Sequence, residues 1–202
     1  MTTLVSPGGR TRLGLPAAAA FAFAPALLAT PEVASAQYLG GGAKSAAETQ
    51  IADFEQMREK FVSLAEAFPE ETYDWRPMEG VRSVRAVFVL IAVEGSQFPT
   101  MWGFDAPPWV SPDGFNAELE RLSELPREDL ILELERSFDH LLSLIRGLSE
   151  EERARQVSFF GLTVDLTTAV TLMGTDMHEH LGQAIAYARI NGIVPPWSRP
   201  GG

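Results

Sequence analysis

The chain has 202 residues, of which 46% are hydrophobic and 21% charged, and its formal net charge at pH 7 is −11. This composition is typical of one globular domain and not of a disordered protein. Because so acidic a surface repels phosphate backbones, nucleic-acid binding is not expected. The chain contains no cysteine, so neither a disulfide nor a thiolate can take part in its chemistry.

The first 36 residues have the pattern of a secretory signal peptide. Arg10 and Arg12 form a positive n-region, residues 13–28 an Ala-rich apolar region, and Ala34-Ser35-Ala36 a small-residue cleavage site. The apolar run is short and interrupted by proline, so we expect no integral membrane span. The sequence predicts cleavage near Ala36 and export to the periplasm or beyond. A disordered N-terminal tail is the alternative interpretation.

The domain itself is predicted to cover residues 44–202, after a flexible, glycine-containing linker at residues 37–43. Apolar residues recur at spacings of three and four from Phe54 to Phe68, which predicts a first helix that ends before Pro69.

A second helix is predicted from an N-cap at Ser83 to about Gln97, with Pro99 as its end. The preceding residues, 73–82, are rich in turn formers. The proline-rich stretch of residues 100–116 predicts a long packed loop.

Two more helices are predicted in the second half of the chain. The third carries apolar residues at helical spacing from Leu130 to Ile145. Gly161 lies in a short connector, Asp165 is a candidate N-cap, and the fourth helix runs to about Asn191-Gly192. Four long helices with no alternating strand pattern predict an all-α fold, a four-helix bundle.

The predicted inner stripe of the fourth helix carries two polar residues, Asp176 and His180, one turn apart. Three interpretations remain open. The pair can form a structural hydrogen bond completed by Gln183 or a backbone group, it can ligate a divalent metal, or Asp176 can raise the basicity of His180 in an acid–base pair. A metal would need a third ligand from another helix.

Glu94 is the candidate for that third ligand, because it is the only group that could bind a metal among the predicted centre-facing residues of the second helix. Its alternative is to extend to water at the helix end. His178 is predicted to lie on the surface, since two residues along a helix turn it away from His180. His140 is predicted at the boundary between core and solvent.

Three segments carry a resemblance to a known family. They are Asp74-Trp75-Arg76-Pro77 with Gly80 to Val84, His178 to Arg189, and Asn191 to Ser198. On these segments the mature chain resembles the DinB-like, YfiT-like superfamily. The resemblance implies a long crossover between helices two and three, frequent dimerisation, and a divalent metal such as nickel or zinc.

The resemblance also implies where the metal ligands should lie. The family's three histidine positions fall on Leu90, Asp176 and His180 of this chain, so one histidine is retained. Each lost ligand costs about two decades of affinity. The metal site is therefore weakened unless Glu94, one turn after Leu90, takes over.

Two functional hypotheses follow. The first is an exported binding or structural module with a degenerate metal site and no catalytic residue. The second is a divalent-metal-dependent hydrolase or transferase that uses Asp176, His180 and Glu94, with Tyr187 near the pocket. A small-molecule ligand fits either hypothesis, but the sequence does not identify it. A homodimer is also predicted, from the apolar residues Val170, Met177, Leu181 and Ile185 beside the inner stripe of the fourth helix.

Overall fold

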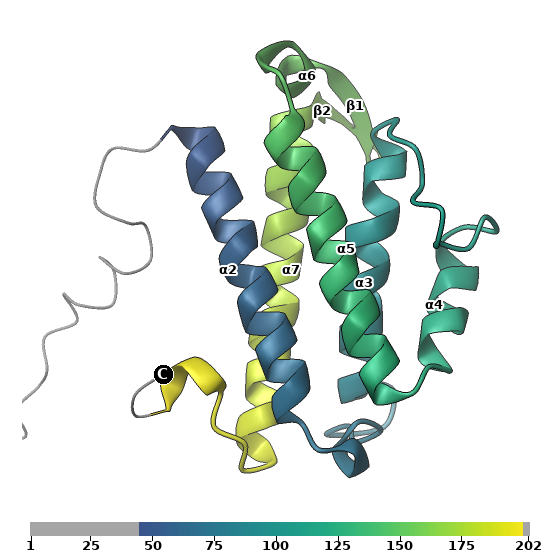
Figure 1. Ribbon diagram of the computed structural model, residues 1–202, viewed down its shortest axis with the longest axis vertical. Coiled ribbons are helices and arrows are strands. Elements are labelled where there is room, and N and C mark those ends of the chain that lie inside the picture. Colours follow the sequence, from purple (N-terminus) through teal and green to yellow (C-terminus); the bar gives the residue numbers. More distant parts are fainter. Residues whose placement is uncertain (1–44, 200–202) are drawn as a thin grey trace, which may run out of the picture. The chain divides into compact units, whose positions relative to one another are not determined.

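Four long helices dominate the computed structural model, which describes residues 45–199 (Figure 1). They are α2 (Ala46–Ala67), α3 (Val84–Met101), α5 (Arg127–Gly147) and α7 (Leu166–Ile190). The predicted all-α four-helix bundle is confirmed. Within the described range, no helix combines the length and the apolar character needed to cross a membrane. The predicted signal peptide (residues 1–36) and linker (37–43) lie outside the described residues.

Polar side chains fix the first residue of three of these helices. Ser83 and Asp165 cap α3 and α7, as predicted, by accepting backbone N–H bonds from the first turn. α2 begins well before the apolar pattern does, because Ser45 and Glu48 form a reciprocal capping box.

The prediction that Pro99 ends the second helix was wrong, since α3 continues to Met101. In this last turn the proline removes a single helical hydrogen bond, the one its N–H would give to the Gly95 carbonyl. The turn is then closed by the N–H groups of Trp102 and Phe104, which both donate to the Pro99 carbonyl at 3.1 Å.

α3 and α5 lie side by side and run in the same direction (Figure 1). Arg85 near the start of α3 donates to the carbonyl of Leu125 just before α5, and midway along both helices Gly95 faces Ser137. The connecting residues 102–126 were predicted as a loop to about residue 116. They also contain a helix that was not predicted, α4 (Phe115–Ser123).

Between α5 and α7 the chain forms a short helix, α6 (Glu150–Ala154), and an antiparallel hairpin of β1 (Gln156–Phe159) and β2 (Leu162–Asp165). The prediction of no strands was therefore incomplete. Phe160 and Gly161 form the two-residue turn with positive φ angles of 47° and 80°. Phenylalanine is not a usual residue at such a φ, so the turn gave no hairpin signal in the sequence.

Apolar side chains from all four long helices fill the centre of the bundle. Val170, Met177 and Leu181 of α7 belong to this core and are at most 4% exposed. Three of the four residues that motivated the homodimer prediction are therefore covered by the chain itself, and Ile185 is partly buried. The homodimer stays a prediction without that support.

Candidate metal centre

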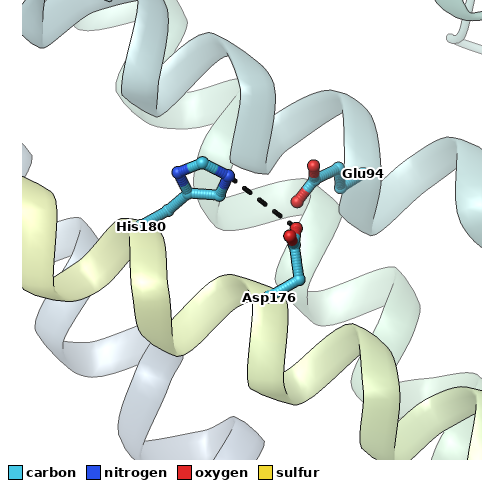
Figure 2. Close-up of side chains that lie close together, drawn as sticks. All are labelled: Glu94, Asp176 and His180. Atoms are coloured by element: carbon cyan, nitrogen blue, oxygen red, sulfur yellow. Dashed lines mark ion pairs between the residues drawn. The ribbon is translucent and has the colours of Figure 1, made fainter.

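Asp176 and His180 project from adjacent turns of α7 toward α3 (Figure 2). His180 Nε2 lies 3.8 Å from Asp176 Oδ2, which is too long for a hydrogen bond. The His180 side chain is 16% exposed and that of Asp176 is 44% exposed. The two residues therefore face each other across a small gap at the edge of the core, and the direct structural hydrogen bond is not formed.

Glu94 of α3 completes the cluster. One ligand atom from each of Glu94, Asp176 and His180 lies within 4.8 Å of the other two. Glu94 is 4% exposed, so the alternative in which its side chain extends to water is wrong. Its Oε2 has no hydrogen-bond partner among the described residues. The sequence-predicted trio is thus brought together, with a buried carboxylate oxygen left unsatisfied.

The environment of Glu94 disfavours its negative charge. Burial, followed by the proximity of the Asp176 carboxylate, raises the pKa of Glu94 to about 8 from an ordinary 4.5. Near neutral pH the side chain is therefore mainly protonated, and any cation held between the two carboxylates would favour the ionised form. The three ligand atoms could therefore hold a divalent cation.

The spacing of the donors suits a first-row divalent ion after small side-chain rotations. Nitrogen and oxygen ligands about 2.1 Å from one ion lie roughly 3–4 Å apart. The 3.8 Å between His180 and Asp176 falls in that range, and the 4.8 Å limit on the trio requires only a modest adjustment. Leu90, one turn before Glu94, is a buried core residue and offers no ligand.

The second nitrogen of His180 belongs to a chain of hydrogen bonds. Nδ1 lies 3.2 Å from Gln183 Oε1, Gln183 Nε2 donates to the Tyr187 hydroxyl at 2.8 Å, and that hydroxyl donates to the Arg82 carbonyl at 3.1 Å. The Tyr187 hydroxyl, expected near the pocket, is thus engaged with backbone. Gln183 was predicted as a possible partner of the Asp176–His180 pair, but the hydrogen bonds that lead on to Tyr187 and Arg82 were not predicted.

The other histidines lie outside the cluster. His178 pairs with Asp53 of α2 at 2.9 Å, and its side chain is 38% exposed, in keeping with its predicted surface position. His140 is half-buried against the ring of Trp109, and burial lowers the pKa of its imidazole. It lies at the boundary, as predicted.

The chain is similar to a known protein family and to several solved structures. The family model of the DinB superfamily matches residues 53–184. YfiT from Bacillus subtilis, described as a probable metal-dependent hydrolase with an unusual four-helix bundle topology, has a similar structure with a TM-score of 0.57 at 16% identity. That match covers 77% of this chain and 93% of YfiT. No curated protein sequence matches the chain.

Two further solved structures have the same fold. A DinB-like protein from Bacillus subtilis, yjoa, gives a TM-score of 0.50 at 17% identity, covering 75% of this chain and 99% of that one. A mycothiol-dependent maleylpyruvate isomerase gives 0.55 at 17% identity and covers 68% of this chain. The match spans only 60% of the isomerase. Identities this low establish a common fold and not a common activity.

Proposed function

This chain belongs to the DinB superfamily, and we propose that it binds a divalent metal ion through Glu94, Asp176 and His180. The observation that carries the proposal is the buried Glu94 carboxylate, whose Oε2 lacks a hydrogen-bond partner among the described residues and which lies beside two other ligand atoms. A buried carboxylate in that position is costly by itself. A cation would offset the cost and satisfy the oxygen.

One imidazole nitrogen and two carboxylate oxygens suit zinc, nickel or another first-row divalent ion. When bound, such an ion supplies Lewis acidity toward a substrate oxygen and lowers the pKa of water. Glu94 would hold it from the core side, and Asp176, whose side chain is 44% exposed, from the solvent side. His180 would supply the neutral nitrogen ligand. The family's helix-two ligand is thereby replaced by Glu94, one turn beyond Leu90.

A metal-dependent hydrolase or transferase is the second candidate function. It is favoured by the number of ligands, because three protein ligands leave a coordination position open, as in catalytic zinc sites, whereas structural sites use four. The exposed edge at Asp176 also gives a small molecule a way to reach the cluster. A binding or structural module, in contrast, requires no catalytic residue beside the three ligands.

Metal analysis of untagged protein tests the proposal directly. Full-length chain purified with nickel, zinc and manganese supplied should retain about one ion per chain, and Glu94→Gln or His180→Gln should lower affinity by about two decades. His178→Gln is the matched control, because it removes a histidine of the same helix that pairs with Asp53 outside the cluster. Wild-type protein without bound metal, or equal loss in the control, would overturn the proposal.

We also propose that the protein is exported. The support is the order of basic, apolar and small residues that ends at Ala36. Cell fractionation with N-terminal sequencing should find a mature chain that begins at Gln37 outside the cytoplasm. Recovery of the chain with residues 1–36 intact in the cytosol would contradict export.

A further inference from the structure

We propose that Gln183 and Tyr187 act as positioning residues that hold the proton of His180 on Nδ1, so that Nε2 presents its lone pair to the metal centre. The inference rests on the proposed function, because it concerns a ligand of that centre. It assigns a role to two residues that do not belong to the ligand set.

The Arg82 carbonyl, the last group in this series of hydrogen bonds, fixes the direction of each of them. The Arg82 carbonyl can only accept, so the Tyr187 hydroxyl must donate to it. The same hydroxyl then accepts from Gln183, which requires the amide nitrogen, Nε2, to face Tyr187. The amide oxygen is left facing His180, and an amide oxygen only accepts. Nδ1 of His180 therefore carries the hydrogen.

A neutral imidazole has one N–H, so a proton on Nδ1 leaves Nε2 unprotonated. Nε2 is the atom that faces Asp176, and their separation of 3.8 Å is too long for that carboxylate to hold a proton on Nε2. Histidine ligates a metal through an unprotonated nitrogen, with the other nitrogen hydrogen-bonded outside the first coordination shell. The hydrogen-bond chain supplies that outer partner.

These hydrogen bonds also link α7, which carries His180, to the residues that precede α3, which carries Glu94. Gln183 and Tyr187 follow His180 by three and seven residues and lie on the same side of α7. Tyr187 is 6% exposed, and its ring meets Trp75 edge-on with 5.3 Å between centroids. Its acceptor, Arg82, lies two residues before α3, the helix that carries Glu94. The imidazole on α7 is thus oriented against the start of α3.

Nitrogen-15 NMR of the histidine rings in full-length, EDTA-treated protein tests the assignment. At a pH of about 8.5, well above the ordinary histidine pKa, wild-type His180 should be predominantly in the Nδ1–H form. Gln183→Leu should shift it toward Nε2–H, and Gln183→Glu, which keeps an acceptor oxygen, should restore Nδ1–H. Gln50→Leu is the control, because Gln50 bridges α2 to Thr171 far from His180.

Zinc titration of the same variants gives a second readout. Gln183→Leu should weaken zinc binding about 10- to 100-fold, and Gln183→Glu should bind at least as tightly as wild type. If Gln183→Leu does not fold, Tyr187→Phe takes its place. Without the Tyr187 hydroxyl the Gln183 amide can rotate, so His180 should give a mixture of tautomers.

The outcomes separate the two proposals. An Nε2–H tautomer in the wild type, or tautomers unchanged in Gln183→Leu and Tyr187→Phe, would overturn the role of Gln183 and Tyr187. Wild-type protein that binds no zinc would overturn the proposed function, and the NMR result would still decide the tautomer.

Discussion

Replacement of Glu94 by glutamine should make the metal-free protein more stable at alkaline pH and leave it nearly unchanged at acid pH. Glutamine has the shape of a protonated glutamate but cannot ionise. In the wild type, burial and the neighbouring Asp176 raise the pKa of Glu94 to about 8. The folded protein therefore holds a proton that the unfolded chain releases at its ordinary pKa of 4.5.

The size of the effect follows from that difference. Below pH 4.5 both states carry the proton and the group has no pH-dependent effect on folding. Between pH 4.5 and about 8 the folded state binds one proton more, so the free energy of unfolding falls by about 1.4 kcal/mol per pH unit. Over 3.5 units the loss is about 5 kcal/mol, an order-of-magnitude figure for a buried group. Glu94→Gln should abolish this loss.

Urea unfolding of both proteins in EDTA, at pH values from 4.5 to 9, measures the difference. Other titrating groups are common to both proteins, so the difference between their unfolding free energies isolates Glu94. We expect it to grow with pH in favour of the variant and to level off above about 8. Parallel pH profiles would refute the reasoning, since they would mean that Glu94 ionises in the folded protein as it does in the unfolded chain.

Four further predictions concern metal binding, two helical glycines and His140. Metal binding at pH 7 should release about one proton, because Glu94 must lose the proton that it holds in the metal-free protein. Calorimetry in buffers of different ionisation enthalpy measures this release. An observed binding enthalpy that does not change with the buffer's ionisation enthalpy would contradict the prediction. Gly95→Ala should cost about 1–3 kcal/mol in urea unfolding, because the added Cβ would lie 3.0 Å from Ser137 Oγ where α3 meets α5. At Gly182 in α7 an added Cβ would have no neighbour within 4 Å, so Gly182→Ala should instead stabilise the protein by about 0.5–1 kcal/mol. Equal changes in unfolding free energy for the two variants would contradict this difference in packing. Burial lowers the pKa of His140, so the free energy of unfolding should fall as the pH drops below the ordinary histidine value of 6.5, and a His140→Gln variant should lose that dependence in acid titrations.

Periodicity and caps were enough to predict the bundle, because each long helix has a continuous apolar stripe and two of them begin at a clear N-cap. The segments that were missed are short. α4 spans Phe115–Ser123, and β1 and β2 have four residues each. Such elements depend on what they pack against, and Phe160, at a positive φ, contacts the ring of Phe98, which lies far away in the sequence.

The candidate ligands could be named from sequence, but their environment could not. Helical spacing placed Asp176 and His180 on one face of α7, and Glu94 was the available partner on α3. That Glu94 is 4% exposed and the Asp176 side chain 44% exposed depends on how α3 packs against α7. The same packing brings Tyr187 to Arg82, 105 residues away in sequence, so no local sequence pattern could predict these hydrogen bonds.

If Glu94 and Asp176 take the places of two histidine ligands, as proposed, the centre should prefer different ions from an all-histidine site. Three imidazoles are neutral and leave the full charge of a divalent ion in the site, whereas ionised Glu94 and Asp176 neutralise it. Carboxylate oxygens favour harder ions, so the balance shifts from nickel and zinc toward manganese relative to an all-histidine site. The same two carboxylates repel each other when the ion is absent, and after burial this repulsion is the second cause of the raised pKa of Glu94. Glu94→Gln removes one of the two carboxylates, so it should alter both the metal preference and the pH dependence of the metal-free protein.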